Sequence, residues 1–343
     1  MDLALEQLSA LAYYVIDPNK RLFIGYIVGA LVFAGFVYFR NAKRNSSFLG
    51  FFRYVFPKKL WLHRSAKLDY QLFIVNRLLR ALLWAPIVIT MVPMALGLTD
   101  ILEYMFGSIE PITSNSTVVI GSFTLLLFIL DDFTRFILHY AMHKIPFLWQ
   151  FHKVHHSAIV MTPITVYRSH PLESFLYATR MAIAQGTAVG VSYYLYGPQL
   201  SMLDILGANV FIFAFNVMGS NLRHSHVRWH WPTPIERWFI SPVQHQIHHS
   251  IDKQHYDKNF GTALAVWDRL FGCLVLSKGI ERIRYGLGSR EKTHASLIDA
   301  YLRPLNAMLS FSKQSMAERS VTMQPMYNEE KQASVKRDTN TSK

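Results

Sequence analysis

Long apolar runs alternate with polar segments along this chain of 343 residues. Several of these runs have the length, about 20 residues, that a helix needs to cross a bilayer. They cover 22–39 and 72–98 and begin near Val118, Phe175 and Met202, with a turn-like Gly197-Pro198-Gln199 between the last two. The pattern predicts an all-α protein with five membrane-spanning helices, although a buried helical core would also account for the weaker runs.

The charged residues predict the orientation of these helices. The segment between the first two runs is strongly basic, whereas segment 99–117 contains acidic residues and neither lysine nor arginine. The basic residues are Arg40, Lys43, Arg44, Arg53, Lys58, Lys59, Arg64 and Lys67. Because lysine and arginine collect on the cytoplasmic side of short loops, we expect 139–174 and the chain after about residue 221 to be cytoplasmic. Lys20 and Arg21, just ahead of the first run, count against this orientation.

Composition agrees with a membrane protein and disfavours other classes. The chain is 51% apolar, with a mean hydropathy of +0.17. Much of its net charge of +13 lies beside apolar runs and in the C-terminal region, where it suits anionic lipid headgroups better than nucleic acid. A single cysteine, Cys273, excludes an internal disulfide and a thiolate cluster. Acidic residues precede the first run, so the N-terminus does not resemble a cleavable signal peptide.

The runs and the polar segments divide the chain into three regions. Residues 1–117 form an N-terminal membrane region with two spans and the basic loop. Residues 118–311 contain the remaining spans and the histidine motifs described next. Residues 312–343 are polar and end in QASVKRDTNTSK, which predicts a disordered tail.

Histidines concentrate in two windows, 139–156 and 224–255, which contain twelve of the fifteen in the chain. A His-x-x-His-His pattern occurs twice, and a His-x3-His pair precedes the first copy. These eight histidines are His139, His143, His152, His155, His156, His245, His248 and His249. On a helix, residues three and four apart share a face, so each triplet presents its imidazoles to one side. Isolated histidines such as His63 and His294 are better explained as hydrogen-bonded core residues.

Eight clustered imidazoles indicate a metal site with more than one ion. Buried ring nitrogens without a partner would each cost roughly 1–3 kcal/mol, and one tetrahedral ion uses only four ligands. Imidazole suits zinc, copper, iron and nickel. Two ions sharing a histidine-only set of ligands is the economical interpretation, and with iron such a site could activate dioxygen at the membrane face.

Two stretches resemble the histidine boxes of the fatty acid hydroxylase/sterol desaturase superfamily. The first is DFTRFILHYAMHKIPFLWQFHKVHHS, residues 132–157, and the second is SPVQHQIHHSIDKQHYDKNFGTALAVWDRLFG, residues 241–272. Between them, RSHPLE (168–173) and His224-Ser225 lie where this superfamily has an Arg-x-His-Pro-x-Glu segment and an isolated His-Ser or His-Thr. The resemblance covers roughly 130–285 and makes 118–311 a fatty acid hydroxylase-like catalytic domain.

The resemblance implies an integral membrane non-haem diiron oxygenase whose histidines enclose two iron ions in a cytoplasmic helical cap. The eight histidines of the boxes are its implied metal ligands, and His224 is a ninth. His170 is either a ligand or a donor to a ligand. His226 and His230 share the neighbourhood of His224, and either could replace it as the ligand.

Four polar residues are candidates for orienting the ligands. Asp132 lies seven residues before His139, hence on the same helical face, and metal-bound histidines usually donate their second nitrogen to a carboxylate or carbonyl. The alternative for Asp132 is a salt bridge to Arg135. Glu173, Asn259 and Asp268 are weaker candidates for the same role.

The implied reaction inserts oxygen into a lipid C–H bond, or desaturates it, with dioxygen and two external electrons. The lipid could be sterol-like, a fatty acyl or sphingoid chain, or an alkylglycerol ether. Neither a cytochrome b5-like segment nor a Gly-x-Gly-x-x-Gly fingerprint is present, so we expect a separate reductase, ferredoxin or cytochrome b5-like donor. A bacterial inner membrane and an endoplasmic reticulum fit equally. Two alternative classes are a membrane metal-transport or metal-storage protein and a non-catalytic lipid-binding relative of the superfamily.

Overall fold

The computed structural model describes residues 13–41, 47–80, 90–200, 209–288 and 291–310. The helical elements in chain order are η1 (Tyr13–Val15), α2 (Ile24–Asn41), α3 (Phe48–Val55), α4 (Lys58–Trp61), α5 (Arg64–Leu79), α6 (Met91–Phe106), α7 (Ser116–Lys144), α8 (Pro146–His156), η3 (Pro163–Tyr167), α9 (Pro171–Tyr196), α11 (Val210–Val217), η4 (Ser220–His224), α12 (Thr233–Glu236), α13 (Pro242–His248), η5 (Lys253–His255) and α14 (Val266–Leu270). A last helix covers 297–310. Within the described residues, extended pairing is limited to two isolated bridges. The predicted all-α class is confirmed.

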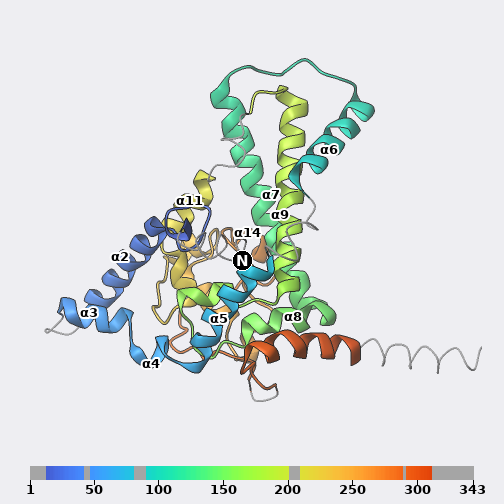
Figure 1. The fold of residues 1–343 in the computed structure, drawn as a ribbon. Coiled ribbons are helices and arrows are strands. Elements are labelled where there is room, and N and C mark those ends of the chain that lie inside the picture. The colour runs from blue at the N-terminus through green and yellow to red at the C-terminus, as the bar shows by residue number, and fades with distance from the viewer. Residues whose placement is uncertain (1–12, 42–46, 81–89, 201–208, 289–290, 311–343) are drawn as a thin grey trace, which may run out of the picture.

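Helices α6, α7 and α9 run side by side and extend away from the rest of the molecule (Figure 1). Two glycines let α9 approach α6 closely. A Cβ atom at Gly190 would lie 2.7 Å from the carbonyl oxygen of Ala95, and one at Gly186 would lie 2.5 Å from Cβ of Met94. Larger side chains at these two positions would therefore push the helices apart.

Two described helices, α2 and α7, are long and apolar enough to cross a membrane by length and composition. They coincide with the predicted runs at 22–39 and from Val118. The run near Phe175 lies in α9, and the run at 72–98 covers the end of α5 and the start of α6, with 81–89 outside the described residues. The run from Met202 begins at 201–208, also outside the described residues, and the predicted tail, 312–343, lies entirely outside them. The count of five spans and the cytoplasmic side of the histidines stay predictions.

The turn between α7 and α8 brings the first two histidine patterns together. Helix α7 ends at Lys144, and Pro146 occupies the first turn of α8. Proline cannot continue the helix before it and biases the preceding residue towards extended backbone, and Ile145 has φ −95° and ψ 112°. The chain therefore turns sharply at Ile145, and α8 packs against the end of α7 (Figure 1).

Helix α5 ties the N-terminal region to the histidine-bearing helices. Leu68 and Leu72 of α5 pack with Val154 of α8 and with Ala300 of the last helix. The fully buried Arg168 donates to Asp69 of α5 at 2.8 Å, to the Val154 carbonyl at 2.9 Å and to Ser157 at 2.8 Å. This buried ion pair fixes the C-terminal end of α8 in place.

Candidate metal centre

Nine histidines converge into two adjoining groups that could each hold a metal ion. In each group, one ring nitrogen of every member lies within 4.8 Å of those of all the others. The first group is His139, His143, His152, His156 and His248, and the second is His155, His224, His245 and His249. Among the described residues, these are the eight histidines of the boxes together with His224.

Two short helices supply most of these side chains. His152, His155 and His156 occupy the last turn of α8, and His245 and His248 lie in α13, with His249 as its C-terminal cap. Helix α13 starts with a capping box, in which Ser241 and Gln244 satisfy each other's backbone N–H groups, and with a proline in its first turn. This cap fixes where the helix begins and therefore which way its histidines face.

The two groups share helix α8 and touch each other. His155 belongs to the second group, while its neighbours His152 and His156 belong to the first. The rings of His156 and His249, one from each group, are stacked with centroids 4.4 Å apart. The two groups therefore form one continuous histidine-lined pocket with two halves.

Backbone carbonyls fix the ring orientation of three histidines. Nδ1 of His139 lies 2.8 Å from the oxygen of Phe260, Nδ1 of His248 lies 2.8 Å from that of Lys258, and Nδ1 of His155 lies 3.1 Å from that of Arg168. A carbonyl oxygen can only accept, so each Nδ1 donates its proton. In the neutral ring Nε2 is then a bare lone pair that is available for a metal.

Nε2 atoms of neighbouring histidines face each other, and their separation tests whether a metal ion fits. Nε2 of His139 lies 3.1 Å from Nε2 of His152, whose Nδ1 is in turn 2.9 Å from the Glu173 carboxylate. Nε2 of His155 likewise lies 3.2 Å from Nε2 of His224. Two facing lone pairs repel unless a cation lies between them. A separation of about 3 Å is that of two nitrogens bound at right angles to one ion by bonds of about 2.1 Å. The donors fit a metal ion of more than four ligands.

Burial keeps these imidazoles neutral. It lowers the pKa of His152 to about 3 and that of His155 to about 4, with neighbouring histidines adding to the shift for His155. Burial also lowers the pKa values of His245, His248 and His249 well below their usual range. Because a metal binds the neutral ring, the site is ready to bind a metal without first losing protons near neutral pH.

The segment after the second box surrounds the ligands with supporting contacts. Asp268 accepts from the backbone N–H groups of Phe260 and Gly261, both at 2.7 Å, and from the Cys273 thiol at 3.1 Å. The Phe260 peptide is thereby held on both sides, since its carbonyl accepts from His139. Asn259 has a positive φ of 57°, and its side chain bonds the backbone of Gln244 and Val275. Both residues support the site, although neither contacts a histidine of the two groups.

The prediction that Asp132 bonds His139 is wrong. Its carboxylate accepts instead from the backbone N–H groups of Ala263 and Leu264, at 2.8 and 3.1 Å, and from the indole of Trp267 at 3.0 Å. The alternative ion pair with Arg135 is also wrong, because Arg135 bonds Asp131 at 2.9 Å. Asp132 therefore anchors the 263–267 segment to α7, close in sequence to the Phe260 carbonyl that orients His139.

Glu173 lies within hydrogen-bond distance of a histidine of the site, with Oε1 2.9 Å from Nδ1 of His152. It is buried at the start of α9, and burial raises its pKa to about 7. Its second oxygen, Oε2, has no hydrogen-bond partner among the described residues. Asp257, which the sequence reasoning missed, lies 3.7 Å from Nδ1 of His143 and pairs with Lys144 at 2.6 Å.

Histidines outside the two groups have other partners. His170 caps α9: its Nδ1 accepts from the N–H of Leu172 at 3.1 Å, and its Nε2 lies 3.2 Å from the Tyr301 carbonyl. With both nitrogens engaged, His170 is not placed as a metal ligand. His226 bonds the Tyr54 carbonyl and His230 bonds Ser277. Of the three candidates near 224–230, the structure brings His224 alone into a group.

A second residue missed by the sequence reasoning is Arg223, next to His224. Its side chain is buried, and its Nε and Nη2 atoms have no partner among the described residues. The guanidinium lies 4.8 Å from the centroid of the Phe215 ring. Together with Arg21 and His224 it lines a cavity of about 30 Å³, room for about two water molecules. The sequence signal was a charge directly beside a predicted ligand.

Sequence comparisons with known proteins find relatives over just under half of this chain. Relatives include alkylglycerol monooxygenase of Caenorhabditis elegans, 23% identical over 167 residues (48% of this chain, 29% of the relative), and that of Xenopus tropicalis, 26% identical over 164 residues (47% and 32%). Ornithine lipid hydroxylase OlsE of Rhizobium tropici is 28% identical over 145 residues (42% and 39%). The chain thus spans about a third of the length of these curated relatives. No solved structure matches significantly.

The family match coincides with the metal centre. Residues 124–273 match the family model described as Fatty acid hydroxylase, and this range contains all nine histidines of the two groups. It also contains Glu173, Phe260 and Asp268, whose contacts support them. Over this region the chain is similar to the fatty acid hydroxylase family.

Proposed function

We propose that this protein is a membrane-bound diiron enzyme that hydroxylates a C–H bond of a lipid with dioxygen and external electrons. The observation that carries the proposal is the pair of adjoining histidine groups, in which Nε2 atoms of neighbouring rings face one another at 3.1–3.2 Å. The similarity to alkylglycerol monooxygenases and to an ornithine lipid hydroxylase supports hydroxylation of a lipid over desaturation.

The donor set favours iron over structural zinc. Structural zinc takes four ligands, usually with cysteines among them, whereas the first group alone offers five imidazoles and the single cysteine of the chain, Cys273, bonds Asp268. Bound iron would supply the reduction of dioxygen and the oxidation of the C–H bond. The nine imidazoles would hold the metal, the Phe260, Lys258 and Arg168 carbonyls would orient three of them, and Glu173 would orient His152.

The position of the centre supports a substrate that comes from a membrane. His139 and His143 lie in the last turns of α7, one of the two helices apolar enough to cross a bilayer. An ion at this end of α7 lies beside the apolar part of the same helix, where a lipid chain would lie. The two electrons would come from a separate reductase, ferredoxin or cytochrome b5-like protein.

Elemental analysis of detergent-purified protein tests the metal centre. We expect about two irons per chain, falling sharply in His155→Ala and His248→Ala, which remove one ligand from each group. His226→Ala and His230→Ala are matched controls, since both histidines lie outside the groups, and they should retain wild-type iron. Zinc, or no metal, unchanged by all four substitutions in folded protein would overturn the proposal.

Isotope incorporation then tests the reaction. With an electron donor system and ¹⁸O₂, the iron-loaded protein should introduce one ¹⁸O atom into an alkylglycerol or an ornithine lipid, detected by mass spectrometry. Loss of two hydrogens without ¹⁸O would indicate desaturation instead. An iron-loaded protein that modifies neither lipid nor a fatty acyl or sterol panel would contradict lipid oxidation while leaving the metal site intact.

A further inference from the structure

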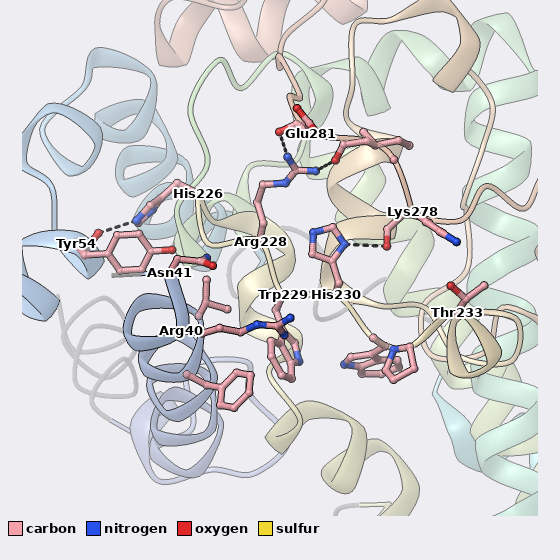
Figure 2. Close-up of a pocket in the computed structure, with 17 residues that line it drawn as sticks. Arg40, Asn41, Tyr54, His226, Arg228, Trp229, His230, Thr233, Lys278 and Glu281 are labelled. Atoms are coloured by element: carbon pink, nitrogen blue, oxygen red, sulfur yellow. Dashed lines mark hydrogen bonds between the residues drawn. The ribbon is translucent and has the colours of Figure 1, made fainter. Parts of the chain in front are cut away.

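A basic pocket separate from the metal centre lies beside the C-terminal end of α2 (Figure 2). Its volume is about 790 Å³, within the roughly 300–1,000 Å³ of small-molecule sites. The walls come from the end of α2, from loop 226–233 and from loop 277–281. None of the nine grouped histidines lines it; His226 and His230 do.

The charged side chains of the pocket favour an anion. Three cationic side chains line the pocket, those of Arg40, Arg228 and Lys278, and the one carboxylate in its lining is that of Glu281. Arg228 already donates to the backbone carbonyls of Ile280 and Glu281, which ties the two loops together. Arg40 and Lys278 are exposed, and neither forms an ion pair with a carboxylate of the described residues. Two cations are therefore available to a ligand.

Aromatic side chains join the pocket to the apolar surface of α2. Trp229 lines the pocket and contacts Phe33 and Phe36 of α2, with ring centroids 4.7 and 5.5 Å apart. Its indole N–H is buried without a partner among the described residues. Tryptophan is enriched at the level of lipid headgroups because its ring is apolar and its N–H is polar.

An exposed apolar stripe on α2 leads to the same place. Ile24, Val28, Val32 and Phe36 follow one another at intervals of four residues and are 49–62% exposed. Residues four apart share a helical face, so the stripe is continuous, and its last member, Phe36, also lines the pocket. An apolar stripe that ends in a cationic pocket is complementary to an amphiphile with an apolar chain and an anionic head.

We propose that this pocket binds the phosphate of an anionic phospholipid, with Arg40 and Lys278 contacting the phosphate and the acyl chain lying along the exposed stripe of α2. Phosphate is the anion that lipid headgroups offer to basic pockets at the ends of membrane helices. The site is independent of the metal centre, so the lipid bound here need not be the one that is oxidised.

Binding of dioctanoyl phosphatidic acid to the full chain in detergent, followed by native mass spectrometry, tests the proposal. We expect saturable binding that weakens about tenfold or more in Arg40→Gln/Lys278→Gln, since two charge-assisted contacts are lost. Arg282→Gln is the control, because Arg282 is an exposed arginine of the same region that does not line the pocket. It should bind as the wild type does.

Two further probes measure separately how much the phosphate and the acyl chain contribute to binding. Dioctanoylglycerol, which lacks phosphate, should bind at least tenfold more weakly, and inorganic phosphate should compete only weakly because it lacks the chain. Equal competition by inorganic phosphate would overturn the lipid assignment, and equal binding by the double variant would overturn the site. Iron content is measured on the same samples. Because the pocket contains none of the grouped histidines, a protein that binds iron but not this lipid would contradict the lipid site alone and not the proposed function.

Discussion

Nδ1 of His152 donates to Oε1 of Glu173 across 2.9 Å, and both side chains are buried. This carboxylate fixes the tautomer that leaves Nε2 free for a metal and raises the basicity of the ring. We expect Glu173→Ala to weaken iron binding about 10- to 100-fold, and Glu173→Gln, which keeps an acceptor but loses the charge, to weaken it less. Competition with a chelator of known affinity measures both.

The control for this prediction is Glu291→Gln. Glu291 pairs with Lys153, which lies in α8 next to His152. Glu291 is exposed and contacts no histidine of the groups. Its substitution should leave iron affinity unchanged. Equal loss of iron in the Glu173 and Glu291 variants would show that the loss comes from α8 in general and not from the contact with His152.

Substitution of Asp132 should lower the stability of the fold rather than remove a contact to a metal ligand. Its carboxylate accepts three hydrogen bonds that fix the 263–267 segment to α7. Asp132→Ala leaves three donors without this acceptor, and we expect the free energy of unfolding to fall by about 2–4 kcal/mol. Denaturant unfolding in detergent provides the value. A variant of wild-type stability that has lost iron would instead support a direct bond to His139.

The metal ligands could be predicted from the sequence because their arrangement is largely local. His-x-x-His-His on a helix faces one side whatever the rest of the chain does, and the turn before Pro146 places α8 against the end of α7. The partners of Asp132 and His170 could not be predicted. Asp132 bonds Ala263, and His170 bonds the Tyr301 carbonyl, each 131 residues away in the sequence. Helical periodicity contains no information about such contacts.

The same limit applies to the apolar runs. Length and hydropathy identified α2 and α7 as candidate spans, because both properties are local. The run beginning near Phe175 became α9, where Gly186 and Gly190 pack closely on α6 and many other residues are buried by neighbouring helices. Whether an apolar helix faces lipid or protein depends on its neighbours, which periodicity does not reveal.

Substitution of His170 should destabilise helix α9 and leave metal binding unchanged. Its Nδ1 accepts from the N–H of Leu172 at the start of α9. Loss of an N-terminal cap costs about 0.5–2 kcal/mol, so we expect His170→Ala to lose stability by this amount and His170→Asn to recover part of it. Iron content should stay at the wild-type value in both. Iron loss in His170→Asn at wild-type stability would restore His170 as a ligand.

His294, which lies outside the two histidine groups, should add to the dependence of stability on pH. Its ring is buried with neither nitrogen bonded among the described residues, and burial lowers its pKa to about 4. The unfolded state, with a pKa near 6.5, binds the proton first, so this contribution is complete above about pH 6.5 and is lost as pH falls towards 4. The loss amounts to at most about 3 kcal/mol.

Substitution of His294 checks this sign. In chelator-treated protein, the grouped histidines add the same trend, so the comparison is between the wild type and His294→Leu across pH 7 to 5. We expect the wild type to lose more stability than the variant over this interval. Parallel curves for the two proteins would mean that His294 is hydrated or bonded when folded, contrary to its burial.

Arg223 should be a residue whose removal stabilises the protein. Its guanidinium is 6% exposed, burial lowers its pKa well below the usual range, and Arg21 lines the same small cavity as a second cation. A buried charge without a counter-ion is strongly unfavourable, and apolar replacements of similar volume are often stabilising. We therefore expect Arg223→Met to raise the free energy of unfolding by about 1–3 kcal/mol, and exposed Arg237→Met, the control, to change it little. A destabilised Arg223→Met would mean that the guanidinium has an anionic partner in the folded protein, and added inorganic phosphate or an anionic lipid that stabilises only the wild type would identify its class.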